Sequence, residues 1–222
     1  MWDARPIDHT RGSVPIWYLV RNGLRAEARA VKVLRRMPTT IREFPSLTTE
    51  RLRLRAPDIN DAEPFRALLS LPAVTRFSNW PDAPKKAEVE RVMRWMYKLH
   101  PSRNGCAWII EDGARKTVIG AIRFNHFDKR WKAGEVGYEL HPDWWGRGLM
   151  TEALRVVVSC GHRVFRLNRI EAWTLPGNDA SDRVLEKAGF RYEGTLRQRA
   201  WFKAAFHDFR MFGRIANDPA TT

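Results

Sequence analysis

The 222-residue sequence predicts an α/β (α+β) domain, in which one mixed, mostly antiparallel central sheet is flanked by helices. Short apolar segments with period-two alternation recur along the chain, and longer segments with helical spacing separate them. Asp112 and Gly113 form a turn signal between two predicted strands, and strands joined by so short a connection pair antiparallel. The composition, 44% hydrophobic and 29% charged, is typical of a globular domain with a substantial core.

The predicted elements begin near residue 45 and follow one another through short connections. Residues 51–55 (RLRLR) alternate apolar and basic side chains, which indicates a strand. Residues 61–69 and 86–99 have helical spacing, and Gly189 ends a later helix. Further strands are predicted at 107–111, 117–124, 133–140, 169–174, 192–199 and 207–214, and further helices from Met150 and at 180–188.

Residues 1–44 read as a basic, partly helical extension that precedes the domain. They carry nine Lys or Arg and four Asp or Glu, a net charge of +5. Residues 17–37 predict a basic amphipathic helix, which could dock on a membrane surface, pack on the domain or stay partly disordered. Its apolar face is small and rich in alanine, which favours the last two. The domain itself is expected at 45–216, followed by a tail at 217–222.

The formal net charge of +14 favours partners rich in phosphate or acidic groups. A phosphate-bearing cofactor, an RNA or ribosomal surface, and a merely solvated basic surface all fit this charge. No run of 18 apolar residues predicts a membrane span, and the start lacks the pattern of a signal peptide, so a cytoplasmic location is expected. Cys106 and Cys160 predict reduced, packed thiols, and no metal site is expected.

Residues 137–154 (GYELHPDWWGRGLMTEAL) carry the clearest chemical signal: a strand, a proline-marked turn, a glycine-spaced loop and a helix follow in order. A helix start has about four unpaired N–H groups and a partial positive charge. Gly146 and Gly148 would let backbone amides approach an oxyanion closely. Thr151 stands where a dinucleotide fingerprint needs its third glycine, and no P-loop lysine follows. The two glycines alone do not decide between a structural turn and a phosphate-binding loop.

Three ordered motifs together extend this reading. Residues 47–55 (LTTERLRLR) precede Asp58 and Asp61 of a predicted helix cap, and residues 145–150 (WGRGLM) form the six-residue loop. Residues 178–190 (NDASDRVLEKAGF) place an Asn-x-x-Ser helix before a Gly-Phe pair. This arrangement resembles the GNAT superfamily of acetyl-CoA-dependent N-acetyltransferases, and within it the RimJ/RimL-like branch that acetylates protein N-termini. Trp145 and Met150 depart from the usual Arg or Gln and Gly or Ala, at positions that bind mainly through backbone.

The resemblance implies a GNAT fold with a splayed strand pair, acetyl-CoA as co-substrate, and direct transfer of the acetyl group to an amine. Ser181 is implied as the acid that protonates the departing thiolate, and Asn178 as a ligand of the pantetheine arm. Both residues also suit a plain helix cap. The remaining implied cofactor ligands are the strand residues Tyr138, Glu139 and Leu140 and the loop residues Trp145, Gly146, Arg147, Gly148, Leu149, Met150 and Thr151.

The resemblance does not supply a general base, because Ala200 stands where the branch often has a glutamate. Glu139 is the first candidate, and His207, Glu171 and Asp143 are weaker ones. An α-amine with a pKa near 8 is about one-tenth neutral at pH 7, whereas a lysine amine with a pKa near 10.4 is neutral only about once in 2,500 molecules. An α-amine acceptor therefore needs less help from a base.

The predicted function is acetylation of a protein N-terminal α-amine, of the ribosomal-protein-alanine type, with possible ribosome association and a monomeric or homodimeric state. One alternative is a small-molecule or antibiotic-detoxifying acetyltransferase, whose acceptor pocket would use the aromatic segments 76–80, 124–131 and 201–206. A non-enzymatic RNA-binding or ribosome-binding module would explain the charge but not the ordered motifs.

Overall fold

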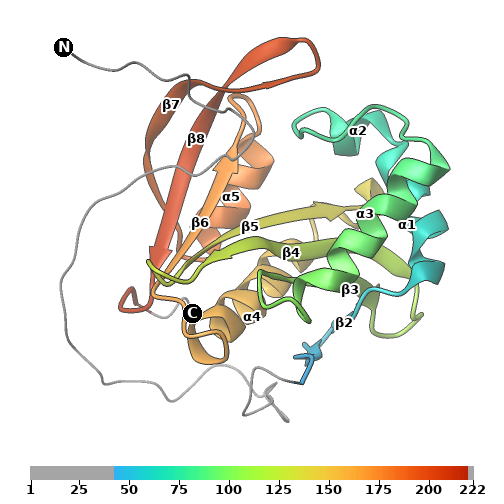
Figure 1. The fold of residues 1–222 in the computed structure, drawn as a ribbon, viewed down its shortest axis with the longest axis horizontal. Coiled ribbons are helices and arrows are strands. Elements are labelled where there is room, and N and C mark those ends of the chain that lie inside the picture. Colours follow the sequence, from blue (N-terminus) through green and yellow to red (C-terminus); the bar gives the residue numbers. More distant parts are fainter. Residues whose placement is uncertain (1–42, 220–222) are drawn as a thin grey trace, which may run out of the picture.

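An eight-stranded sheet in the order β1-β2-β3-β4-β5-β6-β8-β7 organises the chain in the computed structural model, which describes residues 43–219 (Figure 1). All neighbouring strands are antiparallel except β5 and β6, which are parallel. The predicted helix at 17–37 and the end of the predicted tail lie outside the described residues. The strands are β1 Leu47–Thr48, β2 Leu52–Arg55, β3 Cys106–Asp112, β4 Val118–Asp128, β5 Ala133–Leu140, β6 Arg169–Thr174, β7 Arg191–Phe202 and β8 Ala205–Ile215.

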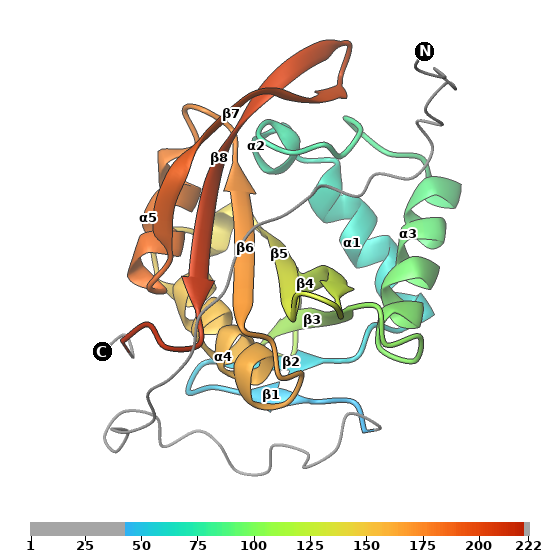
Figure 2. The same ribbon diagram turned by 60° about the vertical axis from the view of Figure 1, so that its left-hand side comes forward.

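Helices cover both faces of the sheet, with α1 and α3 on one face and α4 and α5 on the other (Figure 2). This arrangement confirms the predicted fold class and all the helices predicted within the domain. The two-residue β1 and the four-residue α2 were not predicted, because segments this short show no periodicity. None of the helices in residues 43–219 has the length and apolarity needed to cross a bilayer. The helices are α1 Ala62–Leu69, α2 Pro72–Thr75, α3 Lys86–Leu99, α4 Leu149–Arg163 and α5 Asp179–Lys187, with 3₁₀ turns η1 Ile59–Asp61 and η2 Pro142–Trp144.

Strand β3 lies at the centre of the core because both of its faces are covered. Trp108 and Ile110 pack with residues of α4, while Ala107 and Ile109 pack with α1 and α3. Each large apolar side chain buried in this way contributes about 1.5–3 kcal/mol to folding. Cys106 and Cys160 are buried free thiols in the α4-side cluster, and burial raises the pKa of both.

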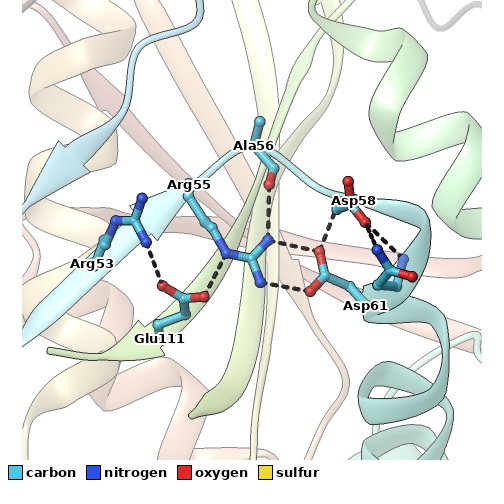
Figure 3. Close-up of polar contacts among 7 residues, drawn as sticks. Arg53, Arg55, Ala56, Asp58, Asp61 and Glu111 are labelled. Carbon is cyan, nitrogen blue, oxygen red and sulfur yellow. Dashed lines mark hydrogen bonds and ion pairs between the residues drawn. The ribbon is translucent and has the colours of Figure 1, made fainter. Parts of the chain in front are cut away.

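A buried ion-pair network fixes the start of the α1 face to strands β2 and β3 (Figure 3). Arg55 donates to both oxygens of Asp61 at 2.7 and 2.6 Å and to Glu111 at 2.5 Å. Hydrogen bonding to Asp61 raises the pKa of Arg55 above its usual value. Asp58 and Asp61 form a reciprocal capping box at η1, which confirms the cap predicted for this segment. The segment entering α1 is therefore held in one place.

Strands β5 and β6 separate after only three paired positions, Ala133–Glu135 with Arg169–Glu171. Beyond these positions β5 stays paired with β4 as far as Leu140, while β6 stays paired with β8 as far as Thr174. The predicted splayed pair is thus present, and one edge of β5 faces a gap in the sheet.

Candidate active site

The glycine-spaced loop adopts a backbone that leaves helix amides unpaired at the open end of the gap. Gly146 and Gly148 both have φ +73°, a left-handed conformation that is costly for residues with a Cβ. Gly148 is the N-cap residue of α4, and no side chain caps this helix start. Leu149 and Met150 bury their side chains in the core. These two residues can therefore offer a ligand only their backbone, which suits anion binding by N–H groups.

Arg51 braces this loop from the edge of β2, a contact that the sequence did not predict. Its Nη1 donates to the carbonyl of Arg147 at 2.9 Å, and its Nε donates to Glu152 at 2.8 Å. Burial alone would raise the pKa of Glu152, but hydrogen bonds from Thr49 and Arg51 lower it overall. Arg51 and Glu152 are 101 residues apart, so no local spacing could reveal their pairing.

Tyr138 and Leu140 direct their backbone groups toward the gap, whereas Glu139 directs its own toward β4. This follows because His141 N–H donates to Ile119 of β4 at 2.8 Å and backbone direction alternates along a strand. The Leu140 carbonyl is already taken by Trp145, whose indole Nε1 donates to it at 2.7 Å. The Leu140 carbonyl, one of the backbone groups predicted to contact the cofactor, is therefore already occupied by Trp145.

A hydrogen bond between hydroxyl groups spans the gap on the α5 side. The Tyr138 hydroxyl lies 2.7 Å from Ser181 Oγ, so it joins β5 to the first turn of α5. Burial raises the pKa of Tyr138, which keeps its proton at neutral pH. Asn178 caps α5 by accepting from Ser181 N–H at 3.3 Å. Asn178 is therefore the helix cap that the sequence allowed. The Ser181 hydroxyl is paired with Tyr138 rather than with the helix backbone.

Glu139 lies on the opposite face of β5 and is held by three donors. Arg123 donates to its two oxygens at 2.6 and 2.9 Å, and the Trp80 indole donates at 2.6 Å. Both charged side chains are nearly buried, with 7% of Arg123 and 5% of Glu139 exposed. Arg123 also lies over the Trp80 ring, 5.2 Å from its centroid. This unit pins the segment after α2 to the centre of the sheet.

The weaker base candidates are also engaged elsewhere. His207 stacks on Phe202 and its Nε2 lies 3.1 Å from the Phe202 carbonyl. Glu171 pairs with Arg169 at 2.7 Å. Asp143 is in the exposed η2 turn, 3.7 Å from His141. Ala200 is the direct cross-strand partner of His207, so the position of the missing glutamate lies in the β7–β8 hairpin.

The tip of the β7–β8 hairpin reaches across to the α2 segment (Figures 1 and 2). Lys203 donates to the Thr75 carbonyl at 2.8 Å and to Asp82 at 2.7 Å. Two of the three aromatic segments named for an acceptor pocket, 76–80 and 201–206, therefore come near each other. The third does not join them, because Phe124 is fully buried in the core and Phe127 packs on Phe165 at the paired end of the sheet.

The profile of the acetyltransferase (GNAT) domain matches residues 51–191, more than half of the chain. The chain belongs to the GNAT acetyltransferase family. This acetyltransferase is an enzyme that depends on acetyl-CoA, and its similarity to named relatives runs along most of its length. It is 33% identical over 172 residues to the uncharacterized N-acetyltransferase YoaA of Bacillus subtilis, covering 78% of this chain and 97% of YoaA.

Other relatives of this acetyltransferase carry names that refer to the ribosome. It is 26% identical over 170 residues to the ribosomal-protein-serine acetyltransferase of Escherichia coli, covering 75% of this chain and 94% of that protein. A solved structure of RimL, a ribosomal L7/L12 α-N-protein acetyltransferase in complex with coenzyme A, superposes with a TM-score of 0.68. That match has 22% identity and covers 81% of this chain and 97% of RimL, which establishes the shared fold.

Proposed function

We propose that this enzyme transfers an acetyl group from acetyl-CoA to the N-terminal α-amine of a protein. The observation that carries the choice of acceptor is the engagement of Glu139 by Arg123 and Trp80. Taking a proton from an amine would neutralise this carboxylate and leave the buried charge of Arg123 without compensation. An acceptor with a low pKa avoids this cost, because about one-tenth of an α-amine is already neutral at pH 7. The names of the ribosomal-protein relatives support the same choice.

In this proposal the cofactor lies in the gap between β5 and β6, with its pyrophosphate on the amides of residues 146–151. The Trp145 amide predicted for this role is not available, because it donates to the Pro142 carbonyl at 2.9 Å. The backbone of Tyr138 and the N–H of Leu140 face the pantetheine arm, and Asn178 flanks it from α5. The amine nitrogen attacks the thioester carbonyl and the carbon–sulfur bond breaks. Ser181, held by Tyr138 at 2.7 Å, then protonates the leaving thiolate. The amine proton passes to water, and Ser181 regains a proton from water.

The acceptor would enter on the face opposite to Ser181, between the α2 segment and the β7–β8 hairpin. Adjacent residues of a strand point to opposite faces, so Tyr138 serves the thiol side and Glu139 the amine side. The Lys203 contacts to Thr75 and Asp82 join the two sides of this entrance at the hairpin tip. A peptide terminus is slender enough to present its α-amine through such an opening.

A small-molecule acceptor is the second candidate, and the hairpin tip favours it. Trp201 and Phe206 are 62% and 61% exposed and contact each other edge to face. Exposed aromatic rings beside an acceptor entrance suit a flat or cationic small molecule. The two candidates share the cofactor site and differ only in what the entrance admits.

One competition assay tests both candidates. The enzyme is incubated with acetyl-CoA, peptides with free α-amines, matched peptides with a blocked N-terminus and one lysine, and small aromatic amines. Products are identified by mass and compared by kcat/KM. The proposal expects the free α-amine peptides to react fastest. Faster reaction of the lysine-only peptides would contradict the argument from Glu139, and faster reaction of the aromatic amines would favour the second candidate.

A further inference from the structure

A cavity lies at the end of the sheet where β5 and β6 are paired, away from the glycine-spaced loop. It measures about 390 Å³, within the size range of small-molecule sites. Strand β5 begins next to this cavity at Ala133 and ends at Leu140, beside the loop that leads into α4. The acetyl-transfer site and this cavity therefore occupy opposite ends of the same strand. The lining comes from the ends of α3 and α4, the β4–β5 turn and the segment before β6.

The floor of the cavity is aromatic and rigidly packed. Phe127 and Phe165 contact each other at 4.9 Å, and Phe165 also contacts the His100 ring at 6.4 Å. Both phenylalanines continue into the core, where they pack on the fully buried Phe124. A flat apolar body placed on this floor would lose water-exposed surface without any rearrangement of the core.

The rim of the cavity carries four cations, Arg103, Lys129, Lys132 and Arg166. None of the four forms an ion pair within residues 43–219. Lys129 makes a long hydrogen bond of 3.4 Å to Asn104. Asp128 is the one acidic residue in the lining, and it accepts the Trp131 N–H at 2.9 Å to cap the β4–β5 turn. The rim therefore presents a net positive charge that the described chain does not neutralise.

Three of these cations are set in left-handed backbone, with φ of 56° at Arg103, 50° at Lys132 and 59° at Arg166. This conformation costs a residue with a Cβ on the order of 1 kcal/mol, and glycine or asparagine would adopt it more easily. Lys116 and Lys203 share this conformation away from the cavity, so the backbone alone does not distinguish the rim, which differs in bringing three such cations around one cavity. A ligand that uses their charge would explain this grouping.

From this geometry we infer that the cavity lined by Phe127, Phe165 and the four rim cations binds a small organic anion. Its ligand joins an aromatic or heteroaromatic ring, which rests on the floor, to a phosphate group, which meets the rim. Aryl phosphates are the simplest members of this class, and nucleoside monophosphates belong to it. The site is independent of acetyl transfer, because it shares no residue with the glycine-spaced loop or with Ser181.

The test uses phenyl phosphate as the probe and the full chain saturated with acetyl-CoA, so that the cofactor site is occupied. Titration calorimetry is compared with phenol, which lacks the charge, and with inorganic phosphate, which lacks the ring. Phenyl phosphate is expected to bind at least about tenfold more tightly than either, a factor that corresponds to about 1.4 kcal/mol. Its affinity should fall as salt rises. Equal affinity for inorganic phosphate would overturn the role of the floor.

Variants locate the binding. Lys132→Asn/Arg166→Asn removes two rim charges while asparagine tolerates the left-handed backbone, and it should weaken phenyl phosphate binding about tenfold or more. Lys129→Gln tests the rim without touching a left-handed position. Arg91→Ala/Arg183→Ala removes two charges at exposed positions of α3 and α5 and should leave the affinity unchanged. Unchanged affinity in both rim variants, or an equal loss in the control, would overturn the inference.

Discussion

Replacement of Glu139 by glutamine should destabilise the enzyme strongly, because it breaks a buried ion pair. Glutamine keeps the shape of the side chain but carries no charge, and its amide group would face the donors of Arg123 and Trp80. Removing one partner of a buried pair costs about 3–5 kcal/mol, since the other charge stays buried without compensation. For a protein of this size each kcal/mol lowers Tm by about 2–4 °C, so Glu139→Gln should lower Tm by about 6–20 °C.

The double variant Arg123→Met/Glu139→Leu separates this structural role from a role as general base. It removes both charges and roughly conserves volume, so it should recover much of the stability that Glu139→Gln loses. Recovery should be partial, because the partly buried Trp80 indole also loses its acceptor. If Glu139 only positions its neighbours, turnover should recover along with Tm.

The assay is a pH series of kcat/KM with an α-amine peptide, run beside thermal unfolding of the wild type and both variants. If Glu139 has no role as a base, the rise of rate with pH follows the amine of the substrate and keeps its shape in every variant. A general base would behave otherwise: its loss costs about 10² to 10⁴ in rate and removes an ionisation from the profile. A double variant with restored Tm but with rates as low as those of Glu139→Gln would refute the positioning role.

The other predictions address the cofactor loop, the hydroxyl pair and one partly buried histidine. Gly148→Val places a β-branched residue at φ +73° and should abolish tight acetyl-CoA binding in calorimetry; unchanged affinity would remove the loop from the cofactor site. Ser181→Ala should lower turnover about ten-fold to a hundred-fold with little change in acetyl-CoA affinity, and Tyr138→Phe should cost less and add nothing to the Ser181→Ala loss; additive losses would mean that the two hydroxyls act separately. Burial lowers the pKa of His162 below 6.5, so the unfolded chain binds the proton first and stability should fall as pH drops below about 6.5; chemical denaturation of wild type and His162→Gln should show this slope only in the wild type.

Strong periodicity is what made most of the fold predictable. Helix α3 and strands β5 and β6 begin and end at the predicted residues, because their apolar spacing is regular and their flanks contain turn residues. The glycine-spaced loop was equally predictable, because the left-handed backbone at Gly146 and Gly148, with φ +73°, is a local requirement that favours glycine. Such features depend on residues that are neighbours in the sequence, so one sequence is enough to predict them.

Contacts between distant segments account for what the sequence did not predict. Arg51 meets Glu152 across 101 residues, and Trp80 meets Glu139 across 59. Nothing in the spacing of a lone arginine or tryptophan indicates such a partner, because the sheet order brings them together. For the same reason the sequence predicted Glu139 as a candidate general base, although the fold surrounds its carboxylate with three hydrogen-bond donors.

The arrangement of β5 relates these contacts to the choice of acceptor. Tyr138 and Glu139 are adjacent, so strand geometry sends one side chain to α5 and the other to the α2 segment. Tyr138 contacts the hydroxyl proposed to protonate the thiolate, and Glu139 contacts Trp80 in the wall of the proposed acceptor entrance. In the proposed site one strand therefore positions both sides of the reacting carbon, while its carboxylate is bound by Arg123 and Trp80. Among amines at neutral pH, the α-amine of a polypeptide best tolerates a site built in this way, because it needs the least help to lose its proton.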